Sequence, residues 1–219
     1  MQGPDLYTLA HKALRAELAT LVQWAGRLDA ADPGDLRAYG TALARALANQ
    51  RTHSAHESRC VVAVLRQFTA DAAVNLVRDH DQAERRTGEL EAMWEAAHDG
   101  GDPAALLAFY RTLNLFVADY LRHLAEEERD LPGLWGRLTP PQMRTVLREM
   151  SRVSCFEEIL GNAPALLPHI SPPERVALLS MAQQQLSPER FAQVRDAVRD
   201  APDSTGTSGA ARNAEGRGI

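Results

Sequence analysis

Three pairs of histidine and glutamate, each four residues apart, are the part of this sequence best suited to chemistry. The pairs are His53/Glu57, His80/Glu84 and His123/Glu127. Residues four apart share one face of an α-helix, with Cβ atoms roughly 5–6 Å from each other. Each pair could therefore present an imidazole and a carboxylate together. Both side chains are common ligands of divalent metal ions.

A further histidine, His11, precedes the three pairs and lies on a separate segment. If these side chains point inward from all four segments, four imidazoles and three carboxylates meet at one centre. Burying a carboxylate costs several kcal/mol, and three carboxylates together repel one another. A pair of divalent or trivalent ions would cancel that cost, and helical bundles hold carboxylate-bridged di-iron centres in their cores. A single pair of this kind is usually a solvated surface pair, so the prediction depends on the recurrence.

The segments that carry these residues have the pattern of long helices. Ala, Leu, Arg and Glu dominate, and apolar residues recur at helical spacing. Turns rich in Asp, Pro and Gly separate four expected helices, at about 5–28, 36–67, 71–97 (with a cap at Thr69 or Asp71) and 104–130. Four long helices with short connections predict an all-α protein built on an up-down-up-down four-helix bundle at residues 1–135.

A second helical section is expected at residues 136–202. Three short patterns, at 138–142, 170–174 and 186–189, place Ser or Thr before Pro, with Glu or Gln following as in a capping box. They predict accessory C-terminal helices at about 140–150, 172–184 and 188–199, with another at 151–160. These helices could cover one end of the bundle, restrict access to the metals, or form a homodimer face. Residues 203–219 are rich in Gly, Ser and Ala, which predicts a disordered tail.

Charge and composition argue against several classes of protein. The net charge is −5, from 24 basic against 29 acidic residues, whereas proteins that coat nucleic acid are usually basic. No apolar run approaches the roughly 18 residues of a membrane span, and no signal peptide is visible. The two cysteines, Cys60 and Cys155, are too few for a disulfide framework. We expect a cytoplasmic protein with no nucleic-acid or membrane partner.

The order and spacing of these motifs, over about residues 5–135, resemble the hemerythrin-like family, whose members carry the HHE cation-binding domain. The matching motifs are His11, the His-Ser-Ala-His-Glu of 53–57, the His-Asp-Gln-Ala-Glu of 80–84, and 123–128 with the following Leu131-Pro132. The resemblance implies a non-haem di-iron site. His11 and His53 would bind one iron, and His80, Glu84 and His123 the other. Glu57 and Glu127 would bridge the irons, together with an oxo or hydroxo group.

Glu84 departs from the pattern of the family's respiratory oxygen carriers, which have a histidine at this position. An anionic ligand in place of an imidazole favours the ferric state. This argues against a reversible oxygen carrier and favours redox chemistry on peroxide, dioxygen or nitric oxide, or the sensing of iron and oxygen. Ligand type leaves manganese and zinc as alternatives to two iron ions.

The helix phase leaves some neighbouring residues open. His56 lies about 60° round the helix from His53, and we expect it to support a ligand rather than to be one. Glu126 and Glu128 flank Glu127, and either would become the ligand if that helix were rotated slightly. His98 and His169 lie beside helix ends and are expected to be structural or solvated.

The leading hypothesis is therefore a di-iron redox protein acting on a small molecule: dioxygen, peroxide or nitric oxide. Oxidation of an organic substrate would need a pocket added by the accessory helices. The alternative is a non-catalytic iron or oxygen sensor, or an iron-binding module, in which metal binding changes a partner surface. A third and weaker hypothesis is a structural helical protein whose histidines bind no metal. The sequence does not name catalytic residues, an electron donor or an oligomeric state.

Overall fold

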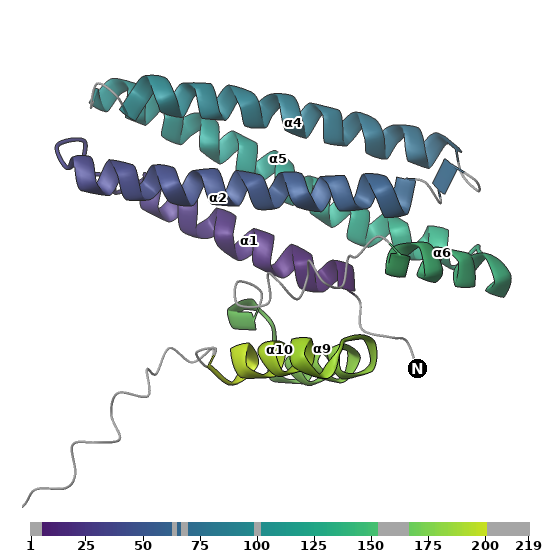
Figure 1. Ribbon diagram of the computed structural model, residues 1–219. Helices are drawn as coiled ribbons and strands as arrows, with labels where there is room; N and C mark the ends of the chain where they lie inside the picture. Colours follow the sequence, from purple (N-terminus) through teal and green to yellow (C-terminus); the bar gives the residue numbers. More distant parts are fainter. Residues whose placement is uncertain (1–5, 63–64, 67–69, 99–101, 153–166, 201–219) are drawn as a thin grey trace, which may run out of the picture. The chain divides into compact units, whose positions relative to one another are not determined.

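The computed structural model describes residues 6–62, 65–66, 70–98, 102–152 and 167–200, and these residues contain helices but no strand. The predicted all-α class is therefore confirmed (Figure 1). The elements are α1 (Leu6–Ala25), α2 (Pro33–Glu57), η1 (Ser58–Val62), α4 (Ala70–His98), α5 (Pro103–Trp135), α6 (Pro140–Arg152), η2 (Leu167–His169), α9 (Pro172–Gln185) and α10 (Pro188–Asp200). None of the described helices is both long enough and apolar enough to cross a membrane.

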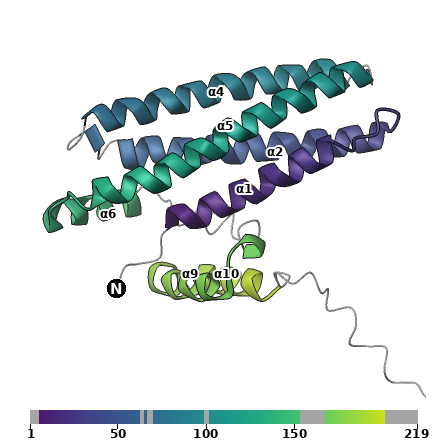
Figure 2. The same ribbon diagram turned by 180° about the vertical axis from the view of Figure 1, so that it is seen from behind.

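By their contacts, the residues fall into two units. The larger unit is Leu14–Cys155, and the smaller joins Met1–Ala13 to Phe156–Ile219. In the larger unit, α2, α4, α5 and the part of α1 after Ala13 run side by side as a helical bundle (Figures 1 and 2). The end of α1 and the beginning of α2 lie at the same end of this bundle as the end of α4 and the beginning of α5 (Figure 1).

Aspartate caps begin two of the long helices, in the turns rich in Asp, Pro and Gly. The backbone N–H of Gly34 donates to Oδ1 of Asp32 at 2.7 Å, where α2 begins. The N–H of Ala104 donates to Oδ1 of Asp102 at 2.9 Å, where α5 begins. In both helices proline occupies the first position, where its missing N–H costs no intrahelical bond.

Two helix ends differ from the prediction. The helix expected to run to residue 67 leaves α-helical geometry after Glu57 and continues as the π-helical turn η1. The helix expected to end near residue 130 runs on to Trp135, through Pro132. Proline so close to the C-terminus removes a single backbone bond, and the last turn still closes because the N–H of Gly136 donates to the Pro132 carbonyl at 3.0 Å.

The core of the bundle has an aromatic cluster between α2, α4 and α5. Tyr39 lies with its ring centroid 4.9 Å from that of Trp94 and 5.9 Å from that of Phe109. All three side chains are buried, and leucines of α1, α2 and α5 surround them. Aromatic side chains bury large areas in fixed geometry, so this cluster holds the helices in register.

The smaller unit has its own helix pair. Ala182 of α9 and Val194 of α10 are buried, with Leu179, Leu186 and Phe191 packed against them. The predicted capping box of α9 is present, since both the N–H and the hydroxyl of Ser171 donate to Oε2 of Glu174 at 2.7 Å. Glu174 also forms an ion pair with Lys12 of α1.

Two predictions fall mainly on residues without described structure. Of the helix predicted at 151–160, the described residues include only 151 and 152, which belong to α6. The predicted disordered tail at 203–219 lies outside the described residues.

Candidate metal centre

The buried face of α2 turns from apolar to ionisable toward its C-terminal end. Its buried residues advance by helical steps through Leu36, Tyr39, Leu43, Leu47 and Gln50 to Glu57. His53 lies between the last two on the same face, and Nε2 of His53 is 3.2 Å from Oε1 of Glu57. Glu57 is only 4% exposed, so the bundle buries a carboxylate where the pattern would otherwise place an apolar side chain.

Helices α4 and α5 bring three further ionisable side chains to Glu57. Nε2 of His80, on α4, lies 3.0 Å from Oε2 of Glu57 and 3.8 Å from Oε1 of Glu127. On α5, Nε2 of His123 lies 3.2 Å from Oε1 of Glu127. His80 and Glu127 are buried, and the side chain of His123 is 13% exposed. Residues 70 positions apart thus meet at one point in the bundle.

The two carboxylates are shared between two groups of potential ligands. His53, Glu57 and Glu127 each offer an atom within 4.8 Å of the others, and Glu57, His80, His123 and Glu127 do the same. Glu57 and Glu127 therefore lie between the imidazole of α2 and the two imidazoles of α4 and α5. Two carboxylates common to two sets of imidazoles have the donor types of a bridged pair of metal ions.

The electrostatics of these side chains also fit a cation. Burial raises the pKa of Glu127, and the charge of Glu57 raises it as well. The hydrogen bond with His80 lowers it, and the net result is a pKa of about 7. Burial also acts against ionisation of Glu57, but the charge of His53 and the hydrogen bonds from His53 and His80 outweigh it and hold its pKa low. Burial lowers the pKa of His80, yet bonds to Glu127 and Glu57 raise it to about 9. Without a cation, the cluster is held together by protons that a metal ion would displace.

A buried nitrogen supports the same interpretation. Nε2 of His123 is buried and makes no hydrogen bond of acceptable geometry to any residue that the structure describes. Burial lowers the pKa of His123, which favours the neutral imidazole. A neutral imidazole with an uncommitted nitrogen beside a carboxylate is in the state that binds a metal ion. The residues present therefore fit a metal centre.

His11 is fully buried on α1. It precedes Leu14 by three residues, and Leu14, Leu18 and Leu21 continue the same face of this uninterrupted helix into the core of the bundle. His11 therefore shares the face of α1 that carries these leucines.

Glu84, expected as a ligand, does not lie with the others. Its side chain is 58% exposed, and both of its oxygens accept from Nε of Arg51 at 3.0 Å. Arg51 also donates to Glu91, so the three residues form a surface network between α2 and α4. The structure therefore does not bring Glu84, predicted as a ligand, into the cluster with the other side chains. The buried residues of α4 step from His80 to Thr87 with half-buried Ala83 between them, which leaves Glu84 on the solvent side.

The three consecutive glutamates of α5 have three different surroundings. Glu127 is buried in the cluster, and Glu126 is exposed. Glu128 turns to α1, where its two oxygens accept from Arg15 at 2.7 and 3.1 Å. The orientation of α5 about its axis therefore places Glu127, and neither neighbouring glutamate, in the cluster.

Histidines outside the expected ligand set lie in other environments. His56 is half-buried on α2 and belongs to neither group of potential ligands found among the described residues. Nδ1 of His98 lies 3.0 Å from the carbonyl oxygen of Trp94, one turn earlier in α4, and His169 is exposed.

Two residues at the cluster were not predicted from the sequence. Ser58, the first residue of η1, places its Oγ 3.0 Å from Nδ1 of His80. Tyr120, one turn before His123, is buried, and its pKa is raised by burial and by the charges of Glu57 and Glu127. The apolar periodicity of α5 could have placed Tyr120 inside. Nothing in the sequence signals the π-helical turn that brings Ser58 to His80.

Comparison with known proteins agrees with this geometry. The family model described as the hemerythrin HHE cation-binding domain matches residues 2–135, which include every residue of the cluster. No curated protein and no solved structure matches the chain. The match extends over more than half of the sequence and coincides with the helices that carry the histidines and buried carboxylates. The chain belongs to the hemerythrin HHE cation-binding domain family.

Proposed function

We propose that this protein binds two iron ions and carries out redox chemistry on dioxygen, peroxide or nitric oxide. The observation that carries the proposal is the position of Glu57 and Glu127, which are buried and common to both groups of potential ligands. A buried pair of carboxylates between imidazoles is costly without cations, and two ions would offset that cost.

The proposed ligands divide evenly between the two ions. His80 and His123 would hold one ion, and His53 would hold the other together with His11, as the resemblance in the sequence implies. Glu57 and Glu127 would be shared. Iron bound in this way would supply a Lewis acid and a source of electrons for a small oxygen-containing or nitrogen-containing molecule.

The chain's own residues would prepare the site for that chemistry. The hydroxyl of Ser58 holds the ring of His80 through Nδ1 and leaves Nε2 facing Glu57. Glu127 is the carboxylate best able to hold a proton near neutral pH, because burial raises its pKa to about 7. The buried leucines and aromatic residues of the bundle exclude water from one side of the cluster.

The exposed position of Glu84 lowers the negative charge of the proposed ligand set. Four histidines and two carboxylates are proposed as ligands, so the charge of a third carboxylate no longer argues for the ferric state. The family's oxygen carriers have a histidine where this chain has Glu84, so the ion on the His80 side would have one protein ligand fewer. An open coordination position is what catalytic metal sites provide for a substrate.

Metal analysis of the protein purified with and without air tests the proposal. We expect about two irons per chain and consumption of peroxide or dioxygen far in excess of the bound iron. The isosteric variant Glu57→Gln should lose the metal, whereas Glu126→Gln, its matched control on exposed α5 surface, should keep it. Iron binding without turnover would replace the redox function with that of a sensor or binding module. Unchanged iron content in Glu57→Gln would refute the assigned site.

A further inference from the structure

A pocket opens between α4 and α5 beside the candidate metal centre. Its volume is ≈ 170 Å³, and His123 is the one member of the described ligand groups in its wall. Ala83 and Arg86 line it from α4, and Asp119 and Tyr120 line it from α5. A space of this size admits a few water molecules or one small solute.

Ala83 is the residue that leaves this space open. It lies between the buried residues His80 and Thr87 on the inward side of α4, and it is itself half-buried. Glu84 is held on the surface by Arg51 and does not line the pocket. Ala83 and His123 both line the pocket, so a larger side chain at position 83 would fill part of the space beside His123.

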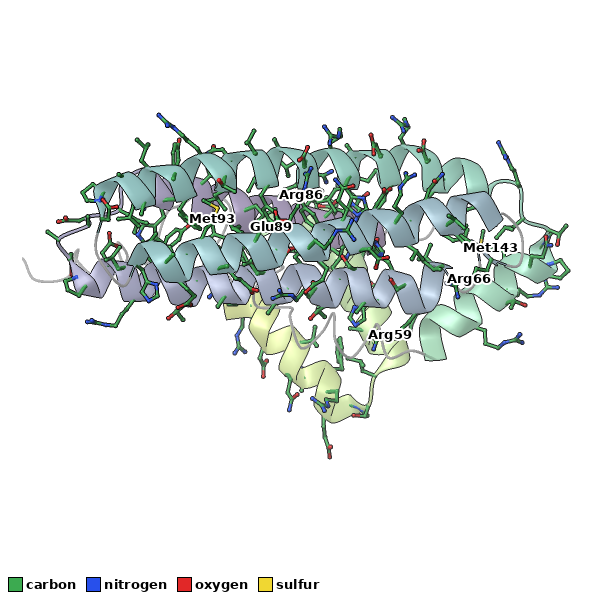
Figure 3. All side chains as sticks on the ribbon, turned by 90° about the horizontal axis from the view of Figure 1, so that it is seen from above. Arg59, Arg66, Arg86, Glu89, Met93 and Met143 are labelled. Atoms are coloured by element: carbon green, nitrogen blue, oxygen red, sulfur yellow. The ribbon has the colours of Figure 1, made fainter. Side chains whose placement is uncertain are left out.

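The charges in the wall of the pocket balance. Arg86 forms an ion pair with Asp119, whose Oδ1 also accepts from Nη2 of Arg122 at 2.6 Å, and Figure 3 shows Arg86 near the middle of the bundle's length. The ionisable residues of the wall other than His123 and Tyr120 are Arg78, Arg86, Arg122, Asp79, Asp119 and Glu126, three basic and three acidic. A wall with no net charge favours neither anions nor cations, but its polar groups can hydrogen-bond a neutral solute.

We propose that this pocket admits a small neutral polar molecule, of the size and polarity of hydrogen peroxide, to the His123 side of the metal centre. This inference rests on the proposed function, because that function identifies the metal centre that the pocket would serve. It also extends that function, because it names the path and the class of substrate. Phe116 and Tyr120, with parallel rings 6.2 Å apart, form an apolar side of the pocket that would limit the water held there.

Chemical labelling of the metal-free protein tests the path without relying on activity. Diethylpyrocarbonate modifies accessible imidazoles, and peptide mapping gives the rate at His123 relative to His98, which lies outside the pocket wall. Ala83→Leu should slow labelling of His123 by roughly tenfold. Ala92→Leu, the same change at an exposed position of α4, should leave the rate unaltered. Arg86→Ala removes a side chain from the wall and should speed the reaction, which keeps the test decisive if Ala83→Leu is unstable.

Hydrogen peroxide itself is the second probe, used on the iron-loaded protein. Ala83→Leu should slow its consumption at unchanged iron content, and Ala92→Leu, outside the pocket wall, should not. Labelling of His123 that is unchanged in both Ala83→Leu and Arg86→Ala, or that slows equally in Ala92→Leu, would overturn the pocket as the path. If labelling follows the pocket but the unaltered protein binds no iron or consumes no peroxide, the proposed redox function fails instead.

Discussion

Ser58 and His80 are 22 residues apart, yet Oγ of Ser58 lies 3.0 Å from Nδ1 of His80. The opposite nitrogen of the same ring, Nε2, lies 3.0 Å from Oε2 of Glu57. The ring is thus held at both ends, by the last residue of α2 and by the first residue of η1. With its pKa raised to about 9, the metal-free imidazole is doubly protonated and donates at both ends.

Removing the serine hydroxyl should weaken metal binding while leaving the fold intact. Groups that orient a ligating histidine typically contribute about 10–100-fold in metal affinity, so Ser58→Ala should raise the Kd by an amount in that range. Competition with a chelator measures the change. Thr52→Ala, at an exposed position of α2, is the control. An unchanged Kd in Ser58→Ala would show that the contact does not orient His80 for a metal.

Glu84→Gln should bind as much metal as the unaltered protein. The carboxylate is exposed and paired with Arg51, so the substitution removes a surface ion pair worth at most about 1 kcal/mol. Metal content by plasma mass spectrometry checks the prediction, with Glu57→Gln as the variant that should fail to load. Loss of one ion per chain in Glu84→Gln would restore the ligand role that the sequence predicts.

Stabilisation by metal should grow as the pH rises. The pKa of His80 is raised from 6.5 to about 9, so its stabilising effect on the metal-free protein is complete below pH 6.5 and is lost as pH rises through 9. Glu127, raised from 4.5 to about 7, binds a proton that the unfolded chain has already lost, so its contribution also falls between those values. Both effects weaken the metal-free protein toward alkaline pH, where a metal ion no longer competes with protons.

Thermal unfolding with and without Mn²⁺, an ion that does not oxidise readily in air, measures this dependence. The difference in Tm between the two forms should increase from about pH 6.5 to about pH 8.5. The lowered pKa of Glu57 acts below pH 4.5 and the lowered pKa of His123 acts below pH 6.5, so neither alters the sign in this window. A difference that stays constant or shrinks as pH rises would contradict the proton competition described here.

Two glycines in long helices should respond to alanine in opposite ways. A Cβ on Gly40 would lie 2.9 Å from Nε1 of Trp94, whose ring is fixed between Tyr39 and Phe109. Gly40→Ala should therefore destabilise the protein by about 1–3 kcal/mol. A Cβ on Gly88 meets no atom within 4 Å, so Gly88→Ala should stabilise by about 0.5–1 kcal/mol through helix propensity. Urea denaturation measures both, and a stabilising Gly40→Ala would show that Trp94 can move.

The sequence by itself determined which residues could form a metal centre and which helices carry them. Helical periodicity and the turns between helices predict four long helices, and Asp32 and Asp102 in those turns cap two of them. The recurrence of His and Glu four residues apart, with His11 before them, pointed to the family to which the chain belongs. These are local signals, because backbone propensity, caps and spacing act within a few turns of one helix.

Only the tertiary structure decided which of those side chains face inward. The pairs His53/Glu57 and His80/Glu84 have the same spacing, but the buried residues of α4 step from His80 to Thr87 and leave Glu84 in solvent. Ser58 reaches His80 through a π-helical turn that no local pattern announces. The phase of a helix about its axis depends on packing against its neighbours. A rotation of a few tens of degrees therefore separates a buried ligand from a surface ion pair.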